Sequence, residues 1–191
     1  METSLNTLNV RIGVCQKCEI SKLLYNQEDL TKGCGKLYGW CGGLDKVDYF
    51  FVGLNPSYNR FPGLMYAFGG RDFDKGTGVE FVNILRDLKI LEKSYVTNAV
   101  KCSTDSNTVE RLHISNCLEY LMGEVELHKP KVFITMGKPV SQFLQNDVQF
   151  CQFLVYNNIE FKEIWHPNYV ISYNRDKIDQ YKRMIIEAVH G

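Results

Sequence analysis

The stretch YFFVGLNPS at residues 49–57 decides the fold. It opens with an apolar run that Gly53 ends, a pattern typical of a short buried strand leading into a polar turn. Two later stretches have a similar form, YVTNAV at residues 95–100 and VFITM at residues 132–136. The sequence therefore predicts buried strands at these three places.

Amphipathic segments alternate with the strands. Apolar residues recur at helical spacing over residues 79–88, and residues 176–190 place apolar side chains on one helical face. Another helix is expected to open at Asn107, which forms a capping pair with Glu110, and to stop before Pro130. This alternation predicts an α/β fold, a three-layer α/β/α sandwich with a short, mostly parallel central sheet.

The region between the third strand and the last helix is less regular. Pro139 fits the first turn of a short helix. Residues 153–156 and 159–165 flank Asn157 and Asn158, and this pattern predicts a hairpin or two short strands.

Length and composition predict one ordinary globular domain over residues 1–191, with the cysteine-containing segment 1–48 packed on it. The formal net charge of zero neither indicates nor excludes a nucleic-acid partner. No apolar run is long enough to span a membrane, and residues 1–11 lack the features of a signal peptide. We therefore expect a cytoplasmic protein without a membrane partner.

The chain has seven cysteines, an odd number that suggests free, metal-binding or catalytic thiols more than disulfides. Cys15, Cys18, Cys34 and Cys41 lie close together in the sequence. A Cys-x-x-Cys pair with two further local cysteines is a common zinc pattern, so a local zinc site is one alternative.

Polar residues stand at the ends of three predicted strands: Asn55, Asn98 and His166. Parallel sheets gather ligands beyond the carboxyl ends of their strands. We therefore expect these side chains to share one site.

The segments around these residues carry a family resemblance. They are GLNPS at 53–57, TNAVKC at 97–102, MGKP at 136–139 and HPNY at 166–169. Each motif is weak alone, but in this order they resemble the uracil-DNA glycosylase superfamily. The resemblance extends from about Cys15 to the C-terminal helix.

The most similar branch is the one with a 4Fe–4S cluster. Its cysteine pattern is matched here by Cys15, Cys18, Cys102 and Cys117, which the resemblance implies as the cluster ligands. That branch usually has an acidic residue in the first motif, whereas this chain has Asn55. An Asn before Pro is similar to the mismatch-specific and thymine-DNA glycosylases, and this departure bears on substrate range and rate more than on the fold.

The resemblance implies a monofunctional DNA repair glycosylase. Such an enzyme flips uracil, or another deaminated base, out of DNA and hydrolyses its N-glycosidic bond, which leaves an abasic site. The expected partner is DNA that contains such a base, and the expected state is a monomer. No lysine stands in the first motif to form a Schiff base, so no lyase step is expected.

Catalytic roles are assigned to Asn55 and His166. The Asn55 side chain can hold the attacking water, although an amide cannot act as a general base near neutral pH. A neutral His166 can donate one hydrogen bond to the charge that develops on uracil O2.

Substrate binding is assigned to Gly53, Phe68 and Asn98. The Asn98 carboxamide offers an acceptor and donors that match N3–H and O4 of uracil, whereas cytosine presents the opposite polarity there. Phe68 is expected to stack on the base, with Phe73 as the alternative.

Contacts to DNA are expected outside the base-binding residues. Ser57, Lys138 and Arg175 are candidates for phosphate contacts. Tyr169 or Val170 is the candidate wedge that fills the space left by the flipped base.

Two alternative functions remain open. One is a non-catalytic superfamily member that binds nucleic acid or damaged bases. The other is a small zinc-binding protein that only echoes these motifs.

Overall fold

The structure is a computed structural model that describes residues 4–19, 36–43, 46–56, 66–69, 76–103 and 108–191. Its strands are β1 (Trp40–Cys41), β2 (Tyr49–Gly53), β3 (Ser94–Asn98), β4 (Val132–Met136) and β5 (Glu160–Ile164). Its α-helices are α1 (Leu5–Gly13), α3 (Gly76–Asp87), α4 (Arg111–His128), α5 (Lys138–Gln145), α6 (Val148–Tyr156), α7 (Pro167–Ile171) and α8 (Ile178–His190). Short 3-10 turns occupy Ala67–Gly69, Leu91–Lys93 and Arg175–Lys177.

The strands form one sheet in the order β1-β3-β2-β4-β5. Strands β2 to β5 are parallel, and β1 is antiparallel to its neighbour, β3. Gly53 pairs in register with Asn98, and Met136 pairs with Ile164. The carboxyl ends of the four parallel strands therefore lie along one edge of the sheet.

Side chains alternate across the sheet, and both of its faces are buried. On one face a row of aromatic rings crosses the parallel strands: the Phe50 ring centroid lies 4.9 Å from that of Tyr95 and 5.5 Å from that of Phe133. The next ring, Phe161, lies 5.8 Å from Phe133. Phe51 points to the other face and belongs to a second core. Cross-strand pairs of this kind stabilise a sheet.

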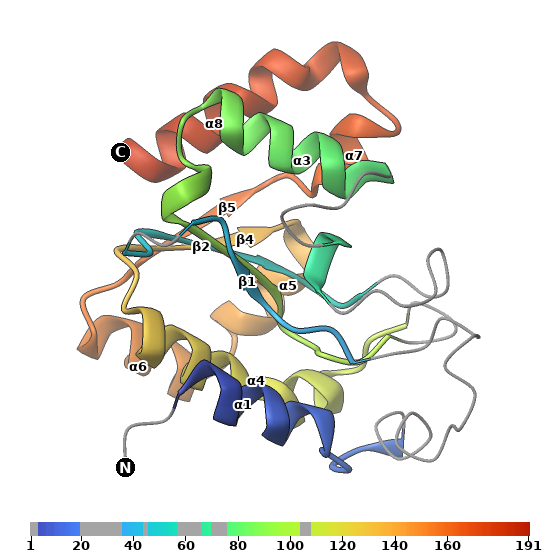
Figure 1. The fold of residues 1–191 in the computed structure, drawn as a ribbon, viewed down its shortest axis with the longest axis vertical. Coiled ribbons are helices and arrows are strands. Elements are labelled where there is room, and N and C mark those ends of the chain that lie inside the picture. The colour runs from blue at the N-terminus through green and yellow to red at the C-terminus, as the bar shows by residue number, and fades with distance from the viewer. Residues whose placement is uncertain (1–3, 20–35, 44–45, 57–65, 70–75, 104–107) are drawn as a thin grey trace.

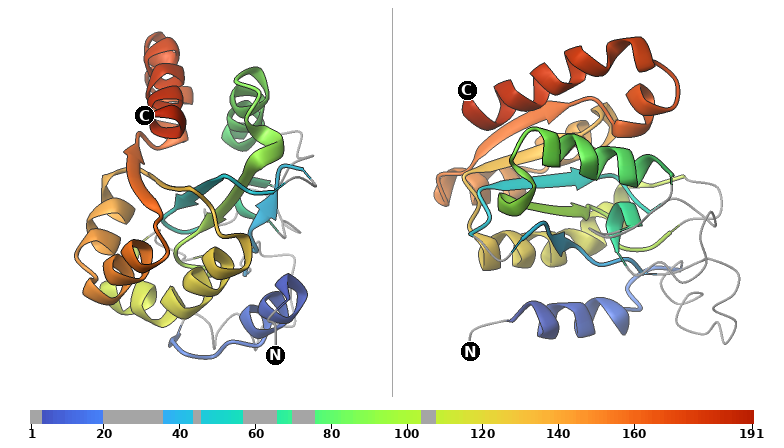
Figure 2. Two further views of the ribbon diagram at one scale, coloured as in Figure 1. Left: turned by 90° about the vertical axis from the view of Figure 1, so that its left-hand side faces the viewer. Right: turned by 45° about the horizontal axis from the view of Figure 1, so that its top comes forward.

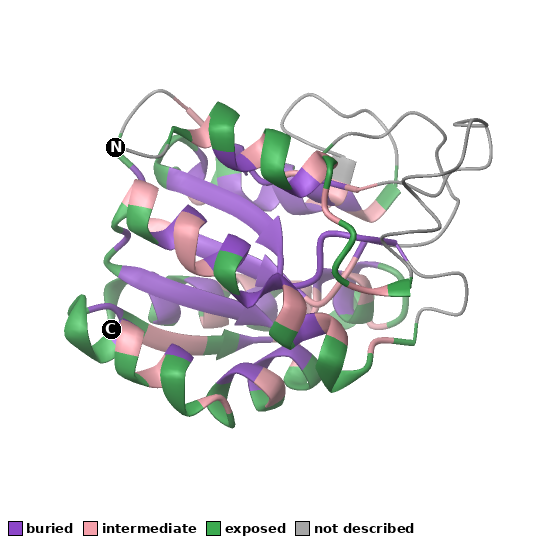
Figure 3. Ribbon diagram, turned by 90° about the horizontal axis from the view of Figure 1, so that it is seen from below, coloured by how far each residue is buried: buried purple, intermediate pink, exposed green. Residues whose placement is uncertain are grey.

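Helices cover the two cores separately. Helices α1, α4, α5 and α6 pack on the face that carries Phe50, and α3, α7 and α8 pack on the face that carries Phe51. Figures 1 and 2 show the sheet between these two layers. Figure 3 shows that the central strands are almost entirely buried while the outer helix surfaces are exposed. The predicted three-layer α/β/α sandwich is confirmed.

Most of the predicted elements are found, with shifted ends. Residues 132–136 form β4 as predicted, whereas the strand predicted over 95–100 is β3, Ser94–Asn98. Asn107 lies outside the described residues. The cap of α4 is Glu110, whose side chain accepts from the backbone of His113 while the His113 side chain accepts from the backbone of Glu110.

The predicted hairpin is wrong. Residues 153–156 belong to helix α6, because Asp147 caps that helix by accepting a hydrogen bond from the Phe150 backbone at 2.9 Å. The second segment is a strand, but β5 pairs in parallel with β4 and so cannot be half of a hairpin. In the described part of the chain, no helix is long and apolar enough to cross a membrane.

Candidate active site

The expected site residues lie where the parallel strands end. Asn98 is the last residue of β3, and Asn55 follows β2 by two residues. His166 follows β5 and is the N-cap of α7. The order of the strands therefore brings these segments to one edge of the sheet.

Gly53 lies between the Asn98 carboxamide and the Phe68 ring. A Cβ atom on Gly53 would lie 2.5 Å from Oδ1 of Asn98 and 3.0 Å from Cε2 of Phe68. Both distances are shorter than ordinary carbon contacts, so any larger residue here would force the Asn98 amide or the Phe68 ring to move. The three predicted substrate-binding residues are thus brought together.

The Asn98 side chain is only 2% exposed. Among the described residues, its carboxamide has no hydrogen-bonding partner, although its backbone carbonyl accepts from Nζ of Lys101 at 2.7 Å. An unpaired amide at a buried position is costly unless a ligand satisfies it. The carboxamide is therefore available for a hydrogen-bonding ligand.

Phe68 has an unusual backbone conformation, with φ of 53° in the left-handed region. Its ring centroid lies 5.8 Å from that of Phe81 and 5.8 Å from the imidazole of His166. Gly78 at the start of α3 makes this placement possible, because a Cβ there would lie 1.9 Å from the Phe68 carbonyl oxygen. Strain of this kind is often found at functional sites. Phe73, the alternative, lies outside the described residues.

His166 is held in one orientation. Its Nδ1 accepts a hydrogen bond from the backbone N–H of Asn168 at 3.1 Å. Burial lowers the pKa of His166 from 6.5 to about 4, so the ring is neutral near pH 7. A neutral ring whose Nδ1 accepts must carry its proton on Nε2, which makes Nε2 a hydrogen-bond donor.

Asn55 lies at the start of the turn after β2 and is partly buried. Its side-chain Nδ2 donates to the carbonyl oxygen of Pro56 at 3.1 Å, and this bond orients the amide. Ser57, the next residue, lies outside the described part of the chain.

The cysteine sets differ in their placement. Cys102 and Cys117 are buried, and burial is the main cause that raises their pKa values. The thiols of Cys18 and Cys15 raise both pKa values further, while Lys101 lowers that of Cys117. Cys41 belongs to β1, where it lies opposite Tyr95. The effects of Cys15 and Cys18 on the pKa values of Cys102 and Cys117 link the four cysteines of the iron–sulfur pattern. Cys34 of the zinc pattern lies outside the described residues.

The four thiols do not form a finished metal site. Within the ranges that the structure describes, no group of three or more His, Cys, Asp or Glu side chains is arranged to hold a metal ion. The donor set nevertheless fits a thiolate-bound group in residue type, since all four side chains are cysteines that approach one another from three separate segments.

An aromatic and cationic cluster lies next to His166. The ring centroids of Trp165 and Tyr169 are 5.6 Å apart, and Nζ of Lys177 lies 5.8 and 5.5 Å from them. Tyr169 is 43% exposed, whereas Val170 is fully buried. Val170 therefore cannot be the wedge, and Tyr169 remains as the candidate. Arg175 forms an ion pair with Glu80, but its side chain is 71% exposed, so its contact with a phosphate remains a prediction.

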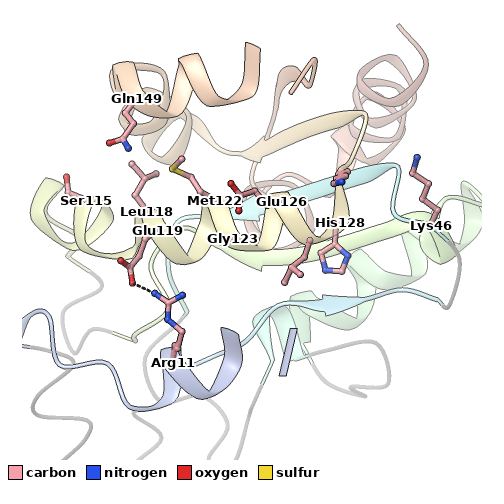
Figure 4. A pocket seen from close by; sticks show the side chains of 12 residues that line it. Arg11, Lys46, Ser115, Leu118, Glu119, Met122, Gly123, Glu126, His128 and Gln149 are labelled. Carbon is pink, nitrogen blue, oxygen red and sulfur yellow. Dashed lines mark hydrogen bonds and ion pairs between the residues drawn. The ribbon is translucent and has the colours of Figure 1, made fainter. Parts of the chain in front are cut away.

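A groove of about 920 Å³ lies elsewhere, along the outer side of α4 (Figure 4). Both acidic and basic side chains line it, and Arg11 forms an ion pair across it with Glu119 at 3.2 Å. None of the predicted site residues lines it.

Sequence reasoning missed two sets of supporting residues. Lys101 and Glu124 form a buried ion pair below Asn98. Asn168 is anchored through Oδ1, which accepts from the hydroxyls of Thr77 at 3.1 Å and Ser172 at 2.7 Å. For the ion pair, the sequence signal was a lysine inside an otherwise buried motif. For the anchoring of Asn168, the sequence contains no local pattern that predicts it.

The fold and the arrangement at the sheet edge agree with the comparison to known families. Residues 42–190 match the family described as the uracil DNA glycosylase superfamily, and the chain belongs to that superfamily.

Named relatives include enzymes called type-4 uracil-DNA glycosylase. The protein of that name from Archaeoglobus fulgidus is 27% identical over 153 residues, which cover 77% of this chain and 67% of the relative. The one from Sulfurisphaera tokodaii is 25% identical over 144 residues, covering 74% and 58%. The matched segment thus spans about three fifths to two thirds of these relatives.

A solved structure shares the fold. It is that of SMUG2 from Pedobacter heparinus, with a TM-score of 0.54, 12% identity and coverage of 75% of each chain.

Proposed function

We propose that this chain is a monofunctional DNA glycosylase that excises uracil from DNA and leaves an abasic site. The observation that supports this most is the convergence at Gly53 of a buried carboxamide, which no described residue satisfies, and an aromatic ring, with a neutral histidine beside that ring. The similarity to proteins named type-4 uracil-DNA glycosylase supports the same function.

Asn98 and Phe68 recognise the flipped base. The carboxamide oxygen accepts from N3–H of uracil and the amide nitrogen donates to O4. The Phe68 ring supplies the stacking surface. Cytosine has an acceptor at N3 and a donor at position 4, so it would leave the buried groups unpaired.

His166 stabilises the leaving group. As the bond from C1′ of the sugar to N1 of uracil breaks, its electron pair passes to the base and negative charge builds on O2. Nε2–H of the neutral imidazole donates to that oxygen. A donor already fixed in place by Asn168 does not have to reorganise during the reaction.

Asn55 positions the water that completes the hydrolysis. The water oxygen bonds to C1′ of the oxocarbenium-like sugar, and the protons of the water are shared between the new hydroxyl and the departing uracil. An amide can orient this water but cannot take its proton near neutral pH. We therefore expect slower excision than an acidic residue at this position would give.

DNA contacts are assigned to residues around the site. Tyr169 is the exposed side chain that enters the stack beside the flipped base, and Lys177 and Lys138 are the cations for nearby phosphates.

Cys15, Cys18, Cys102 and Cys117 are assigned to a 4Fe–4S cluster, and the alternative is a local zinc site of Cys15, Cys18, Cys34 and Cys41. When bound, such a group would connect the N-terminal segment and α4 to the segment that follows β3. It has no part in bond cleavage, because the residues assigned to catalysis lie elsewhere.

The test is an excision assay on duplex oligonucleotides that carry uracil, hypoxanthine, xanthine or thymine, with alkaline cleavage to reveal abasic sites. We expect uracil to be released and Asn98→Ala to lose that activity. Binding of uracil-containing DNA without release of any base would instead identify a non-catalytic binding protein.

A further inference from the structure

The buried ion pair below Asn98 connects α4 to the end of β3. Nζ of Lys101 lies 2.6 Å from Oε2 of Glu124, and the two side chains are 2% and 0% exposed. Burying two charges costs much of what their attraction returns, and apolar replacements of similar volume are often as stable. Stability alone therefore does not account for this pair.

The ion pair forms hydrogen bonds to several residues of β3. Nζ of Lys101 also donates to Oγ1 of Thr97 and to the backbone carbonyl of Asn98, each at 2.7 Å. Oε1 of Glu124 accepts from the hydroxyls of Tyr95 at 3.1 Å and Thr97 at 3.2 Å. The three protons of the ammonium group are thus all directed to acceptors.

These bonds fix the peptide that follows Asn98 from both sides. Its carbonyl oxygen is held by Lys101, and its N–H, which belongs to Ala99, donates to the Gly53 carbonyl at 2.8 Å. Because this peptide plane is held on both sides, the direction of the Cα–Cβ bond of Asn98 is fixed.

We propose that Lys101 and Glu124 are positioning residues that aim the Asn98 carboxamide and thereby set the preference for uracil over cytosine. This inference rests on the proposed function of Asn98 as the base-recognising residue. The amide must present its oxygen to N3–H and its nitrogen to O4, so a shifted or rotated Asn98 would lose both bonds and the discrimination they give. A misplacement of about 1 Å can cost about 100-fold in rate.

The test is a double variant, Lys101→Met with Glu124→Leu, which removes both charges and leaves neither one buried alone. We expect a folded protein with a melting temperature close to that of the wild type. Its single-turnover excision of uracil at saturating enzyme should fall by about 100-fold, with little change in the Kd for DNA. The ratio of uracil to cytosine excision should fall as well.

The matched control is Lys182→Met with Asp87→Leu, which removes an exposed pair of 3.2 Å between α8 and α3. It should leave the rate and the ratio unchanged. If the Lys101/Glu124 double variant does not fold, Thr97→Val is the test, because it removes only the hydroxyl between the two charges. It should lower both the rate of uracil excision and the ratio of uracil to cytosine excision.

A readout without catalysis separates this inference from the proposed function. The side-chain NH₂ resonances of Asn98, assigned with Asn98→Ala, should shift or broaden in the double variant and in Thr97→Val. A wild type that releases no base refutes the proposed function but leaves this measurement valid. A folded variant with wild-type resonances, rate and ratio overturns the positioning role.

Discussion

The backbone N–H of Asn168 donates to Nδ1 of His166 at 3.1 Å, and this bond determines which nitrogen of the imidazole can donate. Asn168 is itself anchored by Thr77 and Ser172. The ring is neutral because burial lowers its pKa to about 4. The N-cap residue of α7 therefore presents a fixed Nε2–H donor at the sheet edge.

Histidine burial predicts how stability depends on pH. Burial lowers the pKa values of both His166 and His128 from 6.5 to about 4. Between these values the unfolded chain binds protons that the folded chain does not, so the free energy of unfolding falls as pH falls from 6.5 toward 4. We expect the urea midpoint to be lower at about pH 5 than at about pH 7.

The variant His128→Phe isolates one part of that effect. Its ring can keep the stacking of His128 on Tyr95, where the centroids are 4.2 Å apart. Because one of the two buried histidines is gone, the loss of stability between pH 7 and pH 5 should shrink by roughly half. An unchanged loss would mean that His128 does not titrate in this way.

Gly53 is expected to be irreplaceable for activity. Gly53→Ala places a Cβ 2.5 Å from Oδ1 of Asn98 and should reduce uracil excision by about 100-fold through misplacement. Overpacking of this kind typically costs about 1–3 kcal/mol of stability, so the variant should still fold.

Gly123→Ala is the control for that substitution. In helix α4 the new Cβ would lie 3.3 Å from Cδ1 of Leu8, and alanine favours the helix by up to about 1 kcal/mol. Thermal melts and single-turnover rates should show an active protein of similar or higher stability. Equal rates for Gly53→Ala and wild type would remove Gly53 from the site.

Much of the fold could be predicted from apolar runs and helical spacing. Residues 132–136 form a continuous apolar run flanked by turn residues, and they form β4 as predicted. Helix α6 was mistaken for a strand because its run of Phe, Leu, Val and Tyr favours both structures. The capping side chain of Asp147 was the signal that distinguishes them.

Tyr169 is predicted to act on DNA and not on the bond. Tyr169→Ala should weaken binding to uracil-containing DNA by about 1–3 kcal/mol, the usual value of one aromatic stacked on a base. Tyr156→Ala, which removes a 90% exposed tyrosine from α6, serves as the control and should bind normally. Fluorescence anisotropy measures both, and equal Kd values would exclude Tyr169 as the wedge.

The cysteine assignment predicts which substitutions remove metal. Cys102→Ala should lose bound iron, the brown colour and thermal stability, because Cys102 is one of the four linked thiols. Cys41→Ala and Cys34→Ala should keep all three. Metal analysis of the purified variants decides between the sets: loss of metal in Cys34→Ala or Cys41→Ala, with retention in Cys102→Ala, would favour the local zinc site.

The site was less predictable than the fold. Motif order led to Asn98, Phe68 and Gly53, and the structure brings these residues together. The Lys101–Glu124 pair was not foreseen, because its members are 23 residues apart and only the packing of α4 on the sheet unites them. The lysine within a buried motif was a local signal, but nothing in the sequence identifies Glu124 as its partner.

We propose that this site breaks the glycosidic bond of uracil with His166 as donor and Asn55 as the residue that positions water. The decisive measurement is single-turnover release of uracil from duplex DNA by wild type, His166→Ala and Asn55→Ala between about pH 5 and 9, a range that includes the ordinary histidine pKa. We expect measurable release by the wild type with no acidic limb near the ordinary histidine pKa, since burial keeps His166 neutral down to about pH 4. We also expect a loss of about 100- to 1,000-fold in His166→Ala, at least as large as the loss in Asn55→Ala. Wild-type protein that binds the DNA but releases no uracil, or two variants that match the wild type, would contradict it.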